Sequence, residues 1–524
     1  MKHSIFISLI KALTIVCYLI PAGVFSQKPD KAALNGITPE IMKQYIGFLA
    51  SDALLGRNTP SPGLDSAAAY ISREFRAMSL SPVNGSYFQP FALCKTDLDT
   101  GCYLQIIRDG HITSLPVKSG FVPYYLTHSK EFTGEIAFAG YGITAPEYGY
   151  DDYAGLDVKG KAVLVFRHEP SENDTGKFFE GREPTSYSGV TSKRLAAGAL
   201  GAGALLVVSE PGNYASLKPR GYLWPALSKN MPADATAYSM CNSGDDEIPA
   251  VQVGEETVNA LFGSVDKLLA IQKDIDKQHA PASFLFPGTL IRLGLYTRTN
   301  ERNVANVVGF IEGSDPVLKN EILVIGAHYD HVGFKKQSKP GDDYIYNGAD
   351  DNASGTAGVI AIARAFAMAK SKPKRSVLFL LFAGEEKGLY GSEFYTANPL
   401  FPLEKTVAML NLDMIGRNAS NALNLVGASK SPDIAAITRA ANKKIRFKLN
   451  DDNSVMGGSD HYNFYKKGVP FMFYFSGLHD DYHQVGDNPD RIDYNKAARV
   501  AQLVFHTAWQ IANDDKHYTV ITKD

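Results

Sequence analysis

The chain has 524 residues, of which 53 are lysine or arginine and 55 are aspartate or glutamate, so its formal net charge is -2. This balance gives no electrostatic reason to expect binding to nucleic acid or to a membrane surface. The length predicts two or three domains, which is enough chain for a large hydrophobic core. Composition says nothing about the oligomeric state.

The first 26 residues are typical of a secretory signal peptide. Lys2 and His3 give a basic start, an apolar stretch follows, and small residues lie near Gly23 and Ser26. The alternative, a membrane anchor, is disfavoured because the unbroken apolar stretch at 12–25 is too short to span a bilayer comfortably. We therefore expect an exported protein that is periplasmic, at the cell surface or extracellular, with no membrane segment in its mature form.

Three cysteines lie outside the predicted signal peptide, namely Cys94, Cys102 and Cys241. Export permits disulfides. Cys94 and Cys102 are close enough in sequence to staple a hairpin, and two reduced, buried thiols are the equal alternative. In both cases Cys241 is left over, and we expect it to be unpaired.

The remaining chain changes its pattern twice. Thr38 and Pro39 are typical of a helix start, and a second helix is expected at about 66–78 after a loop rich in Gly, Pro and Ser. From about 115 to 290, short β-like runs alternate with turns, which indicates a separate β-rich module. After about residue 290, strands alternate with helices, which predicts a largely parallel sheet covered on both faces.

Polar residues lie at the ends of the predicted elements in this last part. Four apolar runs, EILVIGA, SVLFLLFA, TVAMLNL and PFMFYF, are expected to be buried strands. The polar residues that follow them are His328-Tyr329-Asp330-His331, Glu385-Glu386, Asp413 and Tyr482-His483, and the pair Asp350-Asp351 precedes a predicted helix. Ligands of open α/β sheets bind outside the carboxyl ends of the strands, so we expect these residues to converge. Converging carboxylates would lose their charge or destabilise the fold unless a cation neutralises them.

One ligand from each of these five places gives a set of two histidines, three carboxylates and no cysteine. Such a set suits zinc, with manganese or cobalt as alternatives. Five ligands exceed the three that one catalytic zinc ion usually takes from protein. Two metal ions that share one carboxylate fit the count, and such pairs lie about 3.5–4 Å apart. Side chains alternate in direction along extended chain, so in "FAGEEKG" Glu385 can act as a base while Glu386 binds metal.

Six successive motifs resemble those of the secreted dinuclear-zinc aminopeptidase family in order and approximate spacing. They are GAHYDHVG, NGADDNASGTAG, FAGEEKGLYGS, NLDMIGR, GGSDHYNFYKKGVPFMFY and LHDDYHQVGDNPDRID. The superfamily also contains glutamate carboxypeptidase II and transferrin receptor. "LASDALLGRNTPSPG" resembles the segment that precedes the catalytic core in that family, and the stretch from "GYGITAPEYGYDDYAGLDVKGKAVLVF" to "IPAVQV" resembles an inserted protease-associated domain.

The resemblance implies the zinc peptidase fold, an α/β fold with a mixed, largely parallel sheet and helices on both faces. After the signal peptide at 1–26, residues 27–115 would be the N-terminal part of the peptidase domain. Residues 116–289 would be the inserted β-rich protease-associated domain. Residues 290–524 would be the main part of the peptidase domain.

The resemblance also implies how the metal ions are held, with two Zn²⁺ per chain. His328 and Asp413 would bind one zinc ion, and Glu386 and His483 would bind the other. The second aspartate of its pair, Asp351, matches the ligand that bridges the two ions. No ligand position of the family pattern is missing.

Three further residues match catalytic roles in the family. Glu385 matches the general base. Asp330 matches the residue that orients His328, and Tyr482 resembles a tyrosine that in some relatives hydrogen-bonds the tetrahedral intermediate. The implied reaction is hydrolysis of the N-terminal peptide bond of peptide substrates by a hydroxide that bridges the zinc ions.

Two other functions remain as alternatives. A carboxypeptidase or dipeptidase of the same fold would be favoured by an arginine-lined pocket for the substrate carboxylate, for which Arg302, Arg417 and Arg491 are available. A non-enzymatic receptor-like protein is less favoured because the ligand set is intact.

Some polar and aromatic residues receive a structural interpretation. His331, His461 and His479 match no ligand position, so we expect a structural or supporting role for each. Ser459-Asp460 is expected to shape the wall of the site. The "FMFYF" run is interpreted as a core strand rather than as the lining of a substrate pocket.

Overall fold

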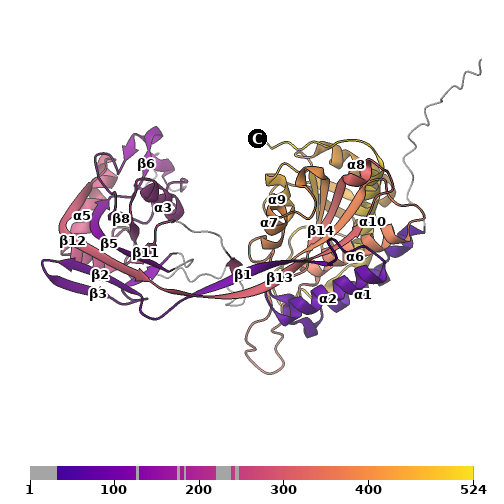
Figure 1. Ribbon diagram of the computed structural model, residues 1–524, viewed down its shortest axis with the longest axis horizontal. Helices are drawn as coiled ribbons and strands as arrows, with labels where there is room; N and C mark the ends of the chain where they lie inside the picture. The colour runs from indigo at the N-terminus through magenta and orange to yellow at the C-terminus, as the bar shows by residue number, and fades with distance from the viewer. Residues whose placement is uncertain are drawn as a thin grey trace, which may run out of the picture.

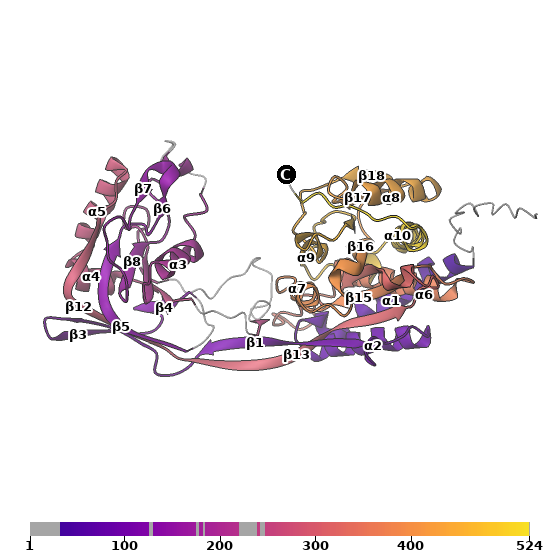
Figure 2. The same cartoon turned by 45° about the horizontal axis from the view of Figure 1, so that its top comes forward.

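A computed structural model describes residues 32–124, 129–173, 178–181, 184–219, 238–241 and 247–522. The predicted signal peptide lies outside these residues. Two lobes are joined by a long two-stranded ribbon made of β1 (Phe88–Leu98) and β13 (Thr297–Ile311), as Figures 1 and 2 show. Among the helices of the described residues, none is long and apolar enough to cross a membrane.

The lobe that contains the C-terminus is built on a nine-stranded mixed sheet with the order β10-β1-β13-β15-β14-β16-β19-β17-β18. Its four central strands, which run parallel to one another, are β14 (Ile322–His328), β15 (Ser376–Phe382), β16 (Thr406–Asp413) and β19 (Phe471–Phe475). Every residue of these strands is buried, as expected for parallel strands that are covered on both faces. β10 (Ser239–Met240) is one edge strand and β18 (Lys448–Asp451) is the other, and β17 (Ala422–Val426) lies between β18 and β19.

Helices cover both faces of this sheet. One face packs against α1 (Pro39–Leu49), α2 (Pro62–Ala77), α6 (Gly355–Met368), α8 (Pro432–Ile445) and α10 (Tyr494–Asn513). The opposite face packs against α7 (Tyr390–Ala397) and α9 (His461–Lys466). Alternate residues of each strand pack against the helices on opposite faces of the sheet, because successive side chains of a strand point in opposite directions. The predicted α/β architecture with helices on both faces is confirmed.

The start of α1 shows how local sequence sets an element boundary. The side chain of Thr38 accepts a hydrogen bond from the backbone N–H of Ile41 at 3.3 Å, and Pro39 occupies the first turn. Capping residues of this kind typically stabilise a helix by about 1 kcal/mol. The helix predicted to begin at Thr38-Pro39 is therefore present.

The second lobe has its own eight-stranded sheet with the order β3-β2-β12-β5-β8-β9-β11-β4. The strands are β2 (Tyr103–Arg108), β3 (His111–Leu115), β4 (Phe121–Pro123), β5 (Lys130–Ala139), β8 (Ala162–Phe166), β9 (Ala204–Val208), β11 (Ala250–Val253) and β12 (Ser283–Leu295). Helices α4 (Glu255–Phe262) and α5 (Val265–Gln278) pack on one face and α3 (Val190–Ala199) on the other. A separate pair of short strands is β6 (Thr144–Ala145) with β7 (Tyr150–Asp151).

This sheet extends beyond the predicted limits of the inserted module, 116–289. The hairpin of β2 and β3 hydrogen-bonds to β12 and belongs to this lobe, although the sequence placed residues 27–115 in the peptidase domain. β12 itself continues past residue 289. The reason is that β2 pairs with a strand about 180 residues later in the chain, and a local pattern does not show such a partner. That this lobe is a protease-associated domain stays a prediction.

The disulfide differs from both alternatives that the sequence suggested. Cys94 is bonded to Cys241, and Cys102 is a free thiol. The expectation that Cys241 is unpaired is therefore wrong. β10 runs antiparallel to β1 with Ser239 opposite Cys94, and this pairing brings together two cysteines that are 147 residues apart.

This pairing can be tested by peptide mapping. In the chain without its first 26 residues, purified without reductant and then unfolded, we expect iodoacetamide to label Cys102 alone. The peptides that contain Cys94 and Cys241 should be joined until a reductant is added, which mass spectrometry detects. A cross-link between Cys94 and Cys102, or three labelled thiols, would contradict the structure.

Candidate metal centre

All five predicted metal ligands lie near the carboxyl-terminal ends of the parallel central strands of the nine-stranded sheet. His328 is the last residue of β14, and Asp413 is the last residue of β16. Glu386 lies in the loop after β15, Asp351 lies just before α6, and His483 lies in the loop after β19. The parallel central strands end at the same edge, and their carboxyl ends therefore deliver these side chains to one place.

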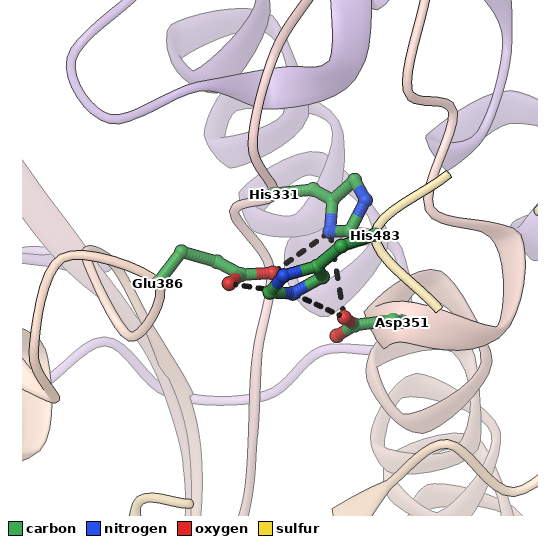
Figure 3. Close-up of side chains that lie close together, drawn as sticks. All are labelled: His331, Asp351, Glu386 and His483. Atoms are coloured by element: carbon green, nitrogen blue, oxygen red, sulfur yellow. Dashed lines mark hydrogen bonds and ion pairs between the residues drawn. The ribbon is translucent and has the colours of Figure 1, made fainter. Parts of the chain in front are cut away.

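The ligand atoms form two groups that share Asp351. His328 Nε2 lies 3.4 Å from Asp351 Oδ1 and 3.4 Å from Asp413 Oδ2. On the other side of Asp351, His483 Nε2 lies 3.1 Å from Asp351 Oδ2 and 3.0 Å from Glu386 Oε2, as Figure 3 shows. Within each group the ligand atoms lie within 4.8 Å of one another. Each carboxylate oxygen of Asp351 thus faces a different group.

His331 joins the second group, although the sequence suggested no ligand role for it. Its Nδ1 donates a hydrogen bond to Glu386 Oε1 at 2.8 Å and lies 3.7 Å from Asp351 Oδ2 (Figure 3). A ring N–H that points at a ligand carboxylate fixes the orientation of that ligand. This geometry agrees with the supporting role that was expected of His331.

The predicted general base lies beside the first group. Glu385 Oε2 is 3.8 Å from His328 Nε2. The backbone N–H of Glu385 donates to Asp330 Oδ1 at 3.2 Å, and His328 Nδ1 lies 3.6 Å from that same oxygen. Asp330 therefore contacts both Glu385 and His328. The hydroxyl of Thr59 donates to the second oxygen of Asp330 at 2.8 Å.

Two further residues hydrogen-bond to predicted ligands. The hydroxyl of Ser459 donates to Asp413 Oδ2 at 2.8 Å, so the residue expected to shape the site wall contacts a ligand directly. The carboxylate of Asp487 accepts the backbone N–H of Asp351 at 3.0 Å. Asp487 was not predicted, because an aspartate on a loop is usually a turn residue.

Tyr482 lies at the entrance of the site. Its ring stacks on the ring of His483 with 3.9 Å between centroids, and 37% of the residue is exposed. Burial, followed by the charges of Asp351 and Glu386, raises the pKa of the Tyr482 hydroxyl. The hydroxyl therefore keeps its proton at neutral pH and can donate a hydrogen bond.

The residues of the site fit a metal ion. Burial raises the pKa of Glu385 well above its usual value, and the nearby charge of Glu386 adds to this effect against the opposing His328. Asp351 Oδ2 and Asp413 Oδ1 are buried and accept no hydrogen bond. Buried carboxylate oxygens without partners are costly. Imidazole nitrogen and carboxylate oxygen atoms are the donors that zinc takes in catalytic sites, so a cation would remove this cost.

A cavity of about 140 Å³ opens onto these groups. Its lining residues are His328, Asp351, Glu385, Glu386, Asp413, Met414, Val455, Gly458, Phe473, Phe475, Leu478 and Tyr482. Apart from the acidic residues and His328, the lining is mostly apolar. Phe473 and Phe475 of β19 contribute to it, so the interpretation of "FMFYF" as core strand alone is wrong. The two residues are two apart in a strand and therefore point to the same side.

None of the three arginines considered for a carboxylate pocket lines this cavity. Arg417 Nη2 pairs with Asp481 Oδ2 at 2.7 Å. Arg302 lies on the ribbon opposite Leu93, and Arg491 is an exposed side chain. Among the described residues that line the cavity, there is no arginine or lysine.

Comparison with known proteins adds a family and a fold. Residues 306–508 match the model of a family described as Peptidase family M28. Aminopeptidase YwaD of Bacillus subtilis is 25% identical over 399 residues, which are 73% of this chain and 70% of that protein. Leucine aminopeptidase 2 of Arthroderma otae is 27% identical over 297 residues, which are 48% of this chain and 54% of that protein. The chain thus spans about half the length of several curated relatives that it matches.

Among solved structures, an aminopeptidase from Aneurinibacillus sp. strain AM-1 has a similar fold. It is 20% identical, with a TM-score of 0.51 over 94% of this chain and 98% of that one. This likeness extends over both lobes and concerns the fold.

The shared position of Asp351 leads to a prediction about metal content. Because Asp351 contributes to both groups, Asp351→Ala should lower the zinc bound per chain more than His483→Ala or Asp413→Ala. Elemental analysis of the dialysed, zinc-loaded proteins measures this. Asp480→Ala is the control, because Asp480 is an exposed carboxylate on the loop of His483 and belongs to neither group. Equal zinc losses in the three ligand variants would contradict the sharing.

Proposed function

We propose that the chain is a zinc aminopeptidase that removes the N-terminal residue of peptides, because its residues 306–508 match the model of peptidase family M28. The observation that carries this proposal is the pair of histidine–carboxylate groups that share Asp351 beside Glu385. The printed names of relatives, aminopeptidase YwaD and leucine aminopeptidase 2, agree with it.

We propose two zinc ions per chain. His328 and Asp413 would hold one ion, Glu386 and His483 the other, and Asp351 would contact both. When bound, such ions make hydroxide available from water near neutral pH and polarise a carbonyl oxygen. The two groups of ligand atoms on opposite sides of Asp351 support this count.

Glu385 would act as the general base. It lines the cavity, and its Oε2 lies 3.8 Å from Nε2 of the proposed ligand His328. Its carboxylate would take a proton from the attacking water and pass it to the amine of the leaving peptide. The bond from the Glu385 N–H to Asp330 fixes the backbone of this base. The hydroxyl of Tyr482 would donate to the oxyanion that forms on the scissile carbonyl.

The lining of the cavity favours an aminopeptidase over a carboxypeptidase. A carboxypeptidase has to bind the C-terminal carboxylate of its substrate, and charged recognition of a carboxylate normally uses arginine or lysine. No described lining residue carries such a group, and Arg417 is paired with Asp481. The carboxylates of the lining suit a free α-amine instead. A non-enzymatic receptor would not explain why the cavity contains costly buried carboxylates.

We also propose that the protein works outside the cytoplasm. The predicted signal peptide at 1–26 supports this, and so does the disulfide between Cys94 and Cys241, because structural disulfides persist in oxidising compartments. Peptides are the expected partners.

Replacement of the base tests the mechanism. Glu385→Gln should keep its zinc and lower kcat by about 10²–10⁴-fold, which is the usual contribution of general base catalysis. Elemental analysis measures the zinc, and release of p-nitroaniline from leucine p-nitroanilide measures turnover. Glu393→Gln, an exposed glutamate in α7, is the control. A Glu385→Gln protein with full turnover would overturn the assignment.

The attacked end of the peptide can be settled with blocked substrates. We expect the zinc-loaded protein to hydrolyse leucine p-nitroanilide and to leave its N-acetyl derivative intact, because the blocked amine no longer fits beside the carboxylates. Chelation should stop hydrolysis, and added zinc should restore it. Release of the C-terminal residue from an N-acetylated peptide would favour the carboxypeptidase. Absence of any hydrolysis by the zinc-loaded protein would favour the receptor.

The apolar part of the lining predicts a preference for apolar N-terminal residues. Leucine p-nitroanilide should have a kcat/KM at least about tenfold above that of aspartate p-nitroanilide, since an unpaired charge in an apolar cavity costs more than about 1.4 kcal/mol. Steady-state kinetics at one pH measures the ratio. Equal values for the two substrates would show that Met414, Phe473 and Phe475 do not contact the substrate side chain.

A further inference from the structure

A short N-terminal segment, "GRNT" at residues 56–59, lies against the loops of the metal centre. It precedes the matched family region, 306–508, and is separated from it by the whole second lobe. The backbone N–H of His331 donates to Arg57 O at 3.2 Å, and the N–H of Gly333 donates to Gly56 O at 3.0 Å. The segment thus runs alongside the chain that follows β14.

Only glycine fits at position 56. Its φ is +69°, and a Cβ atom there would lie 2.1 Å from Gly333 O and 2.5 Å from Tyr346 O. Such distances are far below van der Waals contact. The missing side chain therefore lets the segment approach both loops closely enough to hydrogen-bond to them.

Arg57 joins the loops that carry two of the proposed ligands. Its side chain is completely buried. Nε donates to Tyr329 O at 2.9 Å, Nη1 to Asn347 O at 2.7 Å, and Nη2 to Gly348 O at 3.0 Å. Tyr329 follows the ligand His328 directly, and Gly348 comes three residues before the ligand Asp351. The planar guanidinium has donors in a rigid fork and can hold several acceptors at once.

The same side chain places a buried positive charge within electrostatic reach of the carboxylates of Asp330 and Asp351. Burial lowers the pKa of Arg57 to about 10, while Asp330 and Asp351 act against this effect. The guanidinium is therefore charged at neutral pH. Its hydrogen bonds go to backbone carbonyls, so its role is to set the position of the backbone rather than to pair with one ligand.

Thr59 contacts Asp330, the residue that lies beside both His328 and Glu385. It is buried, and its hydroxyl donates to Asp330 Oδ2 at 2.8 Å. The other oxygen of Asp330, Oδ1, accepts the backbone N–H of Glu385 and lies 3.6 Å from His328 Nδ1. Thr59 thereby sets the rotation of the carboxylate that contacts both Glu385 and His328.

We propose that Arg57 and Thr59 are positioning residues of the metal centre, so that the segment at 56–59 completes a site whose ligands all come from the other end of the chain. Arg57 sets the spacing between the loops of His328 and Asp351, and Thr59 sets the orientation of Asp330. The inference rests on the proposed function for its kinetic readout, and zinc affinity provides a readout that does not depend on hydrolysis.

Thr59 is tested by removing one hydroxyl. Thr59→Val should raise the rate of zinc release to a chelator and lower kcat, each by about 10–100-fold, as is typical when a group that supports a metal ligand is lost. KM should change less than about threefold, because Thr59 does not line the cavity. Thr59→Ser, which keeps the hydroxyl, should restore both values.

Thr507→Val is the matched control for Thr59. Thr507 is also buried, and its hydroxyl donates to Leu503 O within α10, away from the metal centre. If Thr59 had only a structural role, Thr59→Val would lower the melting temperature as Thr507→Val does and leave zinc release and kcat unchanged. That outcome would overturn the proposal for Thr59.

The role of Arg57 is tested with the variant Arg57→Lys, and Arg375→Lys is its control. Arg375 is likewise fully buried and donates to the carbonyls of Ile511, Asp514 and Lys516, but it precedes β15 at the opposite edge of the sheet. Lysine keeps the charge and lacks the fork. Both variants should have a lower melting temperature, and only Arg57→Lys should show a zinc affinity lowered by about tenfold or more in competition with a chelator.

The outcomes separate this proposal from the proposed function. If the wild type binds zinc and hydrolyses no peptide, the function fails, and the zinc affinities of the variants still test the positioning role. If Arg57→Lys binds zinc as tightly as the wild type, the role of Arg57 is wrong. If Arg57→Lys does not fold, judged by circular dichroism, the comparison of Thr59→Val with Thr59→Ser decides.

Discussion

Mutual repulsion among buried carboxylates is the constraint on which this structure depends. Asp351, Glu385, Glu386 and Asp413 line one cavity of about 140 Å³, and burial makes each negative charge more costly. The protein offsets part of that cost with the imidazoles of His328, His331 and His483 and with the buried guanidinium of Arg57. Two oxygens that accept no hydrogen bond remain. Zinc would supply the missing positive charge, and its binding would then stabilise the loops that hold the ligands.

The strand ends explain why the convergence of these side chains could be predicted from sequence. A parallel strand buried on both faces appears as an apolar run, and the first polar residue at its end must lie at the ligand-binding edge. His328 and Asp413 are the last residues of β14 and β16, as this rule requires. The cap at Thr38 was predictable for a similar reason, since its hydrogen bond involves a neighbour only three residues away.

Features that depend on distant partners could not be predicted in this way. Cys94 finds Cys241 across 147 residues, and the guanidinium of Arg57 reaches carbonyls 272 to 291 residues away. The residues "GRNT" carry no pattern that identifies these acceptors. Phe473 was assigned to the core because its strand is uniformly apolar, and composition does not show which face of a buried strand lines a cavity. Residues 103–115 were placed in the wrong lobe because their partner strand lies far along the chain.

The proposed site requires that two cations share Asp351. Crystals of the zinc-loaded protein measured on both sides of the zinc absorption edge test it most directly. We expect two anomalous peaks about 3.5–4 Å apart, one beside His328 and Asp413 and the other beside Glu386 and His483. A single peak, or peaks that do not contact Asp351, would contradict it.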